Sequence, residues 1–291
     1  MMEYDMPLYR PPSEADSLIL QATIGCSHNR CRFCYMYKDK SFRARPWASL
    51  KADIDGVSGH GAGIRRVFLA DGDAFSLSTA RLEEILEYLG RRFPDLQRVS
   101  AYANPSSLLA KSVPEMERLR GLKLSILYYG VETGDPALLE KIDKGATPDE
   151  MAEGCDRASE AGIKLSVTVV LGLGGRGGSL DHAVKTAGLV SRISPRYLSA
   201  LTLMLGPYAG AYAGAMGPGF EFNDPIDDVK ELRTMVEHLE LDRCIFRSNH
   251  ASNHLALAGT LSRDRQALLG TIDLALARPR DYFRDERLRG L

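Results

Sequence analysis

Short apolar runs alternate with amphipathic stretches over the first two thirds of the chain. The apolar runs predict strands, because turn residues bound each of them. The stretches between them predict helices, with start or stop signals such as Thr147-Pro-Asp-Glu150 and Gly162. We expect strands at 18–24, 66–70, 98–102, 123–131, 164–171 and 197–204, and helices at 48–59, 79–93, 114–121, 147–161 and 179–193.

These six repeats indicate the α/β class, with a parallel sheet buried on both faces and curled by right-handed crossovers into a partial (β/α)6 TIM-like barrel. After Met204 the pattern changes to a Gly/Ala/Pro-rich loop at 206–219. A helix to about 241, an extended run at 244–247 and a last helix over about 263–277 follow. We expect an N-terminal arm at 1–16, the partial barrel at 17–222 and a mostly helical C-terminal extension at 223–291 that closes the barrel.

The composition is that of an ordinary globular protein, with 291 residues, 44% hydrophobic and 26% charged. A formal net charge of -1 argues against a dedicated binder of nucleic acid or anionic membranes. The first 16 residues contain no apolar stretch, and no run of about 18 apolar residues occurs. We therefore expect a cytoplasmic protein without a signal peptide or a membrane-spanning helix.

Three cysteines, Cys26, Cys31 and Cys34, lie in one loop directly after the first predicted strand. Such a cluster in a chain without a secretion signal favours metal binding over disulfides. Three thiolates leave one coordination position open, as a metal centre that does chemistry requires. His28 inside the loop is an alternative fourth ligand that would close the site. Cys155 and Cys244 are isolated and are expected to be buried thiols.

Polar or glycine-rich segments follow four further predicted strands. They are Asp71-Gly-Asp73, Ser100-Ala-Tyr-Ala-Asn-Pro105, Gly130-Val-Glu-Thr-Gly134 and Gly172-Leu-Gly-Gly175. In barrels of parallel strands, functional residues gather at the carboxyl ends of the strands. Together with the cysteines, these segments predict one site along this edge of the sheet.

This order of motifs, with an aromatic residue in Cys31-Arg-Phe-Cys34, resembles the radical S-adenosylmethionine (SAM) superfamily over roughly residues 17–205. The core is similar to the branch with oxygen-independent coproporphyrinogen oxidases, methylthiotransferases and the Elongator acetyltransferase. The resemblance implies a [4Fe-4S] cluster on the three cysteines, with SAM on the fourth iron. It also implies reductive cleavage of SAM to a 5′-deoxyadenosyl radical, which abstracts hydrogen from an unidentified substrate. The Cys-x4-Cys-x2-Cys spacing departs from the usual three then two and leaves the subfamily open.

The resemblance also implies cofactor contacts. Asp73 would meet the SAM ammonium, Glu132 the ribose or amino-acid part, and Lys144 the carboxylate. Alternatives remain: Asp71 and Asp73 shape a turn, Glu132 caps the helix that begins at 135–136, and Lys144 is solvated. Tyr102 and Thr168 stand where that branch has Glu and Asp. The full set is Phe33, Tyr35, Asp71, Gly72, Asp73, Tyr102, Glu132, Lys144, Thr168 and Gly172.

The polar segment Phe246-Arg-Ser-Asn-His-Ala-Ser-Asn-His254 is the main candidate for substrate binding. Its alternative is a set of turn and helix caps, and His250 with His254 would suit a metal if the segment were helical. Tyr208 and Tyr212 are further lining candidates. The expected substrate-binding residues are Asn104, Thr202, Met204, Arg247, Asn249, His250 and Asn253.

Around the cysteines lie Arg30, Arg32, Lys38, Lys40, Arg43 and Arg45, opposed only by Asp39. This basic excess predicts docking of an acidic electron donor such as a flavodoxin or ferredoxin, with a plain solvated loop as the alternative. No second cysteine cluster and no Asp-x-His-x-x-Gly cobalamin motif occurs. The competing functions are a zinc-binding or nucleic-acid module, and an iron–sulfur electron carrier without SAM chemistry.

Overall fold

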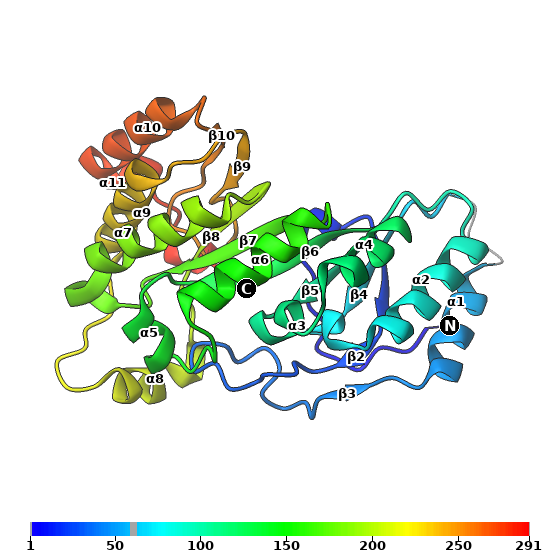
Figure 1. Cartoon of the computed structure of the whole chain (residues 1–291). Helices are drawn as coiled ribbons and strands as arrows, with labels where there is room; N and C mark the ends of the chain where they lie inside the picture. The colour runs from blue at the N-terminus through cyan, green and yellow to red at the C-terminus, as the bar shows by residue number, and fades with distance from the viewer. Residues whose placement is uncertain (1, 59–62, 291) are drawn as a thin grey trace. The chain divides into compact units, whose positions relative to one another are not determined.

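The computed structural model describes residues 2–58 and 63–290, and the chain forms two compact units (Figure 1). Unit one comprises residues 1–29, 36–129 and 153–165, and unit two comprises 30–35, 130–152 and 166–291. The ends of the predicted arm and extension, Met1 and Leu291, lie outside the described residues, as does the predicted helix end Gly59.

Unit one contains the first half of a mostly parallel, eight-stranded sheet, in the order β1-β4-β5-β6, with the last residues of β6 in unit two. Apolar runs form these strands because both faces of a parallel sheet are covered, and in Arg66–Ala70 every residue after Arg66 is buried. A short antiparallel pair, β2 and β3, lies beside the cysteine loop in the sequence. The elements are β1 Leu18–Gln21, β2 Thr23–Ile24, β3 Arg43–Ala44, α1 Trp47–Ser58, β4 Arg66–Ala70, α2 Thr79–Arg92, β5 Arg98–Ala103, α3 Pro105–Leu109, α4 Val113–Gly121 and β6 Leu124–Glu132, with 3-10 turns at Pro12–Glu14 and Ala74–Ser76.

Unit two continues with β7-β8-β9-β10, in which β7, β8 and β9 are parallel and β10 is antiparallel to β9. Helix α9 packs against α7 and α10 (Figure 1). The elements are α5 Pro136–Lys141, α6 Pro148–Glu160 (partly in unit one), β7 Lys164–Leu171, α7 Gly175–Ile193, β8 Tyr197–Thr202, α8 Ala209–Met216, α9 Pro225–His238, β9 Cys244–Arg247, β10 Ala258–Leu261, α10 Arg265–Ala277 and α11 Pro279–Tyr282, with 3-10 turns at Gly206–Tyr208 and Glu286–Leu288.

The α/β class and the six predicted strands are confirmed, and the sheet is open in its strand order, from β1 to β10. The predicted mostly helical extension also supplies β9 and β10, so the sheet has eight strands instead of six. Strand β10 escaped prediction because it is four residues long and contains Gly259, which weakens the strand signal. Within the described residues, no helix has both the length and the apolar composition that crossing a lipid bilayer requires.

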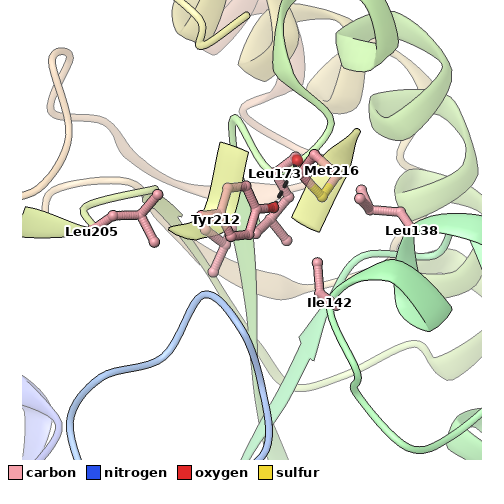
Figure 2. Close-up of a cluster of buried hydrophobic side chains, with 7 residues drawn as sticks. Leu138, Ile142, Leu173, Leu205, Tyr212 and Met216 are labelled. Carbon is pink, nitrogen blue, oxygen red and sulfur yellow. Dashed lines mark hydrogen bonds between the residues drawn. The ribbon is translucent and has the colours of Figure 1, made fainter. Parts of the chain in front are cut away.

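The prediction of an unstructured loop at 206–219 is wrong, because Ala209–Met216 forms helix α8. Two large side chains anchor this Ala/Gly-rich helix: Tyr212 and Met216 are buried in a hydrophobic cluster with Leu138, Ile142, Val170, Leu173 and Leu205 (Figure 2). Burial of these two side chains compensates the weak packing of the small residues around them.

The Tyr212 hydroxyl donates a hydrogen bond to the Leu173 carbonyl at 2.8 Å inside this cluster (Figure 2). We expect Tyr212→Phe to lower the free energy of unfolding by about 1 kcal/mol, because a buried carbonyl loses its partner while the ring packing is kept. Chemical denaturation measures the change. Tyr208→Phe is the control, since Tyr208 is exposed and its hydroxyl can exchange partners with water. Equal losses in both variants would contradict the assigned role of the buried hydroxyl.

Candidate functional site

The predicted site residues divide between the two units. Unit one contains Cys26, Asp71, Gly72, Asp73, Tyr102 and Asn104. Unit two contains the rest: Cys31, Phe33, Cys34, Tyr35, Glu132, Lys144, Thr168, Gly172, Thr202, Met204, Arg247, Asn249, His250 and Asn253.

In unit one, the turn after β4 touches the beginning of the cysteine loop. A Cβ atom added at Gly72 would lie 2.9 Å from the Cys26 Cβ and 2.6 Å from the Tyr37 ring, so only glycine permits this approach. The structure therefore brings together Cys26 and the 71–73 turn, two features that the sequence placed 45 residues apart.

Asp71 is fully buried, and one of its carboxylate oxygens is held by three donors. Oδ2 accepts from the Gly25 amide at 3.1 Å, from Gln21 Nε2 at 3.2 Å and from Lys40 Nζ at 3.0 Å. Oδ1 is buried without a hydrogen-bond partner among the described residues. The Oδ2 contacts agree with the turn-shaping alternative for Asp71, whereas Oδ1 is an acceptor that is not used.

Asp73 is also fully buried, and Ser27 links it to a second predicted residue, Asn104. Ser27, inside the cysteine loop, donates to Asp73 Oδ2 and in turn accepts from Asn104 Nδ2 at 2.8 Å. Asn104 itself caps α3 by accepting from the Ser107 amide. Asp73 Oδ1 has no hydrogen-bond partner in the described part of the chain. A buried acceptor with unused capacity suits a cationic donor.

Burial raises the pKa of Asp73 to about 6, although the Ser27 hydrogen bond opposes the rise. A carboxyl whose pKa is higher in the folded than in the unfolded chain destabilises the fold where it is ionised. This cost is complete above pH 6 and disappears below pH 3.8, the ordinary pKa of the group. We therefore expect the apoprotein to gain about 1 kcal/mol from Asp73 between pH 7 and pH 5. Denaturant titrations of wild type and Asp73→Asn isolate this contribution, and parallel pH profiles of the two proteins would refute it.

In unit two, the second half of the cysteine loop is fixed to the segment after α5. The Arg32 amide donates to the Ile142 carbonyl at 2.9 Å, and Phe33 packs against the hydrophobic cluster of α5 and α8. The Tyr35 ring stacks on Tyr208, with ring centroids 5.7 Å apart. The aromatic residue between the last two cysteines therefore anchors the loop by packing.

The thiols differ in their suitability as metal ligands. Cys26, Cys31 and Cys34 are partly exposed, whereas Cys155 and Cys244 are buried, as predicted. Burial raises the pKa of Cys244 to about 12 and also raises the pKa of Cys155. Because the thiolate is the ligand, the three loop cysteines are the better donor set.

Within residues 2–58 and 63–290, no group of three or more His, Cys, Asp or Glu side chains is placed to hold a metal ion. A cluster of iron and sulfide bonded by thiolates nevertheless matches the chemistry of the loop donors. The donor types of the loop therefore fit such a cluster.

Glu132 ends β6 in the left-handed region, with φ 65°, which is uncommon for a residue with a side chain. Its carboxylate folds over Gly130, where a Cβ would collide with it, and pairs with Lys144 Nζ at 2.9 Å. Both side chains are largely buried. Asp135 is the residue that caps α5, which excludes the capping role for Glu132. The burial of Lys144 against Glu132 excludes the solvated role for Lys144.

Gly172 follows β7 with φ +85°, and its amide donates to Glu231 Oε1 at 2.9 Å. An added Cβ would lie 3.1 Å from Asp228 Oδ1, so glycine is required here for local structure as well. Thr168 is partly buried within β7. Tyr102 belongs to an aromatic group in unit one, 5.1 Å from Phe68 between ring centroids.

The polar side chains of segment 246–254 mainly form hydrogen bonds that stabilise the local structure. Asn253 accepts from the Thr202 hydroxyl at 3.0 Å and donates to the Ala200 carbonyl, so the structure joins two predicted substrate residues. His250 bonds to Ser252, and burial lowers its pKa. The segment is not helical, which removes the geometry assumed for a two-histidine metal site. Arg247 and Asn249 are exposed, and Met204 is partly buried.

A cavity of about 360 Å³ lies in unit two, where Gly172 and Thr202 contribute to its wall. Asn223, Asp228, His254, Glu286 and Arg289 also line it, and of these the sequence singled out only His254. One sequence signal could have marked these acids as buried, although not their partners: Asp228 and Glu231 are three residues apart beside the apolar positions of α9, and both are buried there.

Fewer basic side chains around the cysteines are available to a partner than the composition of this stretch suggested. Lys40 Nζ is buried against Asp71, Arg45 pairs with Asp53 at 2.6 Å, and Arg43 pairs with Asp5 at 3.0 Å. In unit two, Arg30 faces Asp143 at 3.4 Å. These pairs reduce the charge that remains to attract an acidic partner.

Comparison with known proteins places these features in a family context. The family model of the radical SAM superfamily matches residues 20–190. The heme chaperone HemW of Bacillus subtilis (strain 168) is 28% identical over 129 residues, which are 43% of this chain and 33% of HemW. Coproporphyrinogen III oxidase (HemN) from Escherichia coli has a similar fold, with a TM-score of 0.60 and 16% identity over 76% of this chain and 51% of HemN. Methylornithine synthase (PylB) gives a TM-score of 0.52 and 15% identity over 78% of this chain and 64% of that protein. The chain thus spans about a third of HemW and half of HemN.

Proposed function

The chain belongs to the radical SAM superfamily, whose model matches more than half of it, and from this we propose that it is an enzyme that uses a [4Fe-4S] cluster and SAM to abstract hydrogen from a small-molecule or peptide substrate. When bound, the cluster supplies the electron that cleaves SAM to a 5′-deoxyadenosyl radical. In this proposal Cys26, Cys31 and Cys34 are the cluster ligands.

The observation that carries the proposal is the contact between Cys26 and the buried turn at Gly72. The turn contains two buried carboxylate oxygens that lack hydrogen-bond partners among the described residues, Oδ1 of Asp71 and Oδ1 of Asp73. An ammonium group such as that of SAM would supply the missing donors and would lower the raised pKa of Asp73. We assign Asp73 the role of holding that ammonium beside Cys26.

The residues of unit two add supporting features. Glu132, in its left-handed conformation and paired with Lys144, provides the buried polar groups that the ribose and carboxylate of SAM would require. We further propose that Phe33 packs beside the adenine of SAM and that the Tyr35 backbone bonds to its edge. The strained position of Glu132 supports a functional role, because such conformations cluster at functional sites.

The test is anaerobic reconstitution with iron and sulfide, followed by dithionite and SAM, with 5′-deoxyadenosine measured by chromatography. Formation of 5′-deoxyadenosine above a control without SAM is the expected result. A fully loaded cluster that yields none would reject the proposal. The competing zinc module predicts instead a colourless protein with bound zinc, and the electron carrier predicts a coloured protein that leaves SAM intact.

The natural electron donor in this proposal is an acidic flavodoxin or ferredoxin. The ion pairs of Arg43 and Arg45 leave a modest basic surface, so we expect a weak, salt-sensitive encounter. Reduction rates measured with a flavodoxin at rising ionic strength test it, and rates independent of salt would argue against electrostatic docking.

Heme binding is a second candidate, favoured by the 28% identity to the heme chaperone HemW. Titration of the apoprotein with hemin tests it through the visible absorbance of the porphyrin. Saturation at equimolar hemin would support heme handling, and a spectrum that is unchanged by the protein would exclude it.

A further inference from the structure

The cavity of unit two has the size of a small-molecule site, and its wall has apolar and polar parts as such sites do. Its volume of about 360 Å³ falls in the range of ~300–1,000 Å³ that is usual for such sites. Leu203, Leu205 and Phe222 form apolar parts of the wall, and Asn223 and Asp228 form polar parts. An occupant would therefore have an apolar body and at least one polar group.

Several hydrogen-bond donors of this wall are already engaged. Arg289 donates to the Glu286 carboxylate and to the Ser252 carbonyl at 2.7 Å. The Thr202 hydroxyl donates to Asn253 Oδ1 at 3.0 Å. A phosphate or a carboxylate that accepted from these particular donors would have to break the bonds that they make now.

The acceptors, in contrast, have unused capacity. Asn223 Nδ2 lies 3.0 Å from Asp228 Oδ1 and 3.0 Å from Glu231 Oε2, and these two carboxylates fix the orientation of the amide. Asn223 Oδ1 is consequently left buried without a hydrogen-bond partner in the described residues. Because this oxygen is buried, the acceptor that the wall itself presents is the Asp228 carboxylate, which suits an occupant that donates hydrogen bonds.

The charges favour a cation. Asp228 and Glu286 line the cavity, and the buried Glu231 lies directly behind Asn223, whereas Arg289 is already paired with Glu286. His254 lies between the two wall acids, with Nε2 3.3 Å from Asp228 Oδ2 and Nδ1 3.9 Å from Glu286 Oε2. Burial raises the pKa of Asp228, and the neighbouring Glu231 adds to that rise. A positive group on the ligand would relieve the repulsion between these carboxylates.

We propose that this cavity binds the substrate of the enzyme and that the substrate is a small organic cation, a protonated amine or amidine on an apolar body, with Asp228 as its counter-ion. The identification as substrate rests on the proposed function. One position from each expected set lines the cavity, Gly172 from the SAM set and Thr202 from the substrate set, so competition with SAM is the measurement that separates the two assignments.

Matched pairs of small probes test this in the apoprotein by calorimetry or ligand-observed NMR. Benzamidine and 2-phenylethylamine carry the charge, and benzamide and 2-phenylethanol are their neutral counterparts. We expect each cation to bind at least about tenfold more tightly than its neutral counterpart, which is the size of one charge-assisted hydrogen bond. Asp228→Asn should remove this preference.

Asp227→Asn is the matched control, because it removes the same charge one residue along α9, where Asp227 faces Arg176. Glu286→Gln is a second variant with little risk to folding, since its side chain is 69% exposed; it leaves Arg289 unpaired and should weaken the cations about threefold. Equal binding of charged and neutral probes, an unchanged preference in Asp228→Asn, or displacement of the probes by SAM would each overturn the proposal. None of these measurements needs the iron–sulfur cluster, so their failure is distinct from a failure of SAM cleavage.

Discussion

Cys31→Ala is expected to abolish retention of the iron–sulfur cluster. With one of three thiolate ligands gone, the cluster would be held by two protein bonds, and reconstituted protein should fall from about four irons per chain to background. Iron and sulfide analysis after gel filtration, together with the visible spectrum, measures the loss. The 5′-deoxyadenosine yield should fall with the iron content.

Cys155→Ala is the matched control, because it also removes one thiol, from the buried face of α6. This variant should keep its cluster, although the missing sulfur costs about 1 kcal/mol of stability. Equal iron loss in Cys31→Ala and Cys155→Ala would refute the ligand assignment. His28→Ala tests the alternative in which His28 is a fourth ligand. Loss of iron in this variant would mean that the loop histidine closes the site.

The positions of the strands could be predicted from the sequence because parallel strands buried on both faces produce long apolar runs. The runs at 66–70 and 164–171 match β4 and β7 residue for residue. The polar positions that follow them, including Asp73, are buried as a consequence of that packing. Local pattern and global fold agree in this part of the chain.

Helix α8 shows where composition misled the prediction. Its glycines and alanines resemble a loop, but Tyr208, Tyr212 and Met216 repeat at intervals of four residues, which is the spacing of one helix face. Two of these side chains enter the hydrophobic cluster. The spacing of the large residues was the informative signal, and the small residues between them were not.

Lys40 and Asp228 could not be assigned from sequence because their surroundings come from distant segments. Lys40 belongs to a basic stretch that resembles a solvated surface, yet its ammonium is buried against Asp71, 31 residues away. Asp228 is next to His254, which follows it by 26 residues. Whether a charged side chain is solvated or paired depends on tertiary contacts that local periodicity does not encode.

Glu231→Ala is expected to lower the free energy of unfolding by about 3–5 kcal/mol, the usual cost of leaving a buried polar network without its charged member. Glu231 is fully buried in α9 and is bonded to four groups. These are the Gly172 amide at 2.9 Å, the Ser179 hydroxyl, His182 Nδ1 at 2.9 Å and Asn223 Nδ2 at 3.0 Å. Without the carboxylate, these buried groups lose their acceptor.

We expect Glu231→Ala to disturb the cavity of unit two as well, because Glu231 holds both the Gly172 turn and the Asn223 amide of the cavity wall. Glu231→Gln keeps the side-chain volume and part of the hydrogen bonding, so its loss of stability should be smaller, and its binding of 2-phenylethylamine should fall between wild type and alanine. Glu237→Ala, on the same helix but paired at the surface with Arg233, should change stability by less than about 0.5 kcal/mol. Denaturant titration compares the three variants, and a Glu231→Ala protein as stable as Glu237→Ala would show that the network does not hold the two segments together.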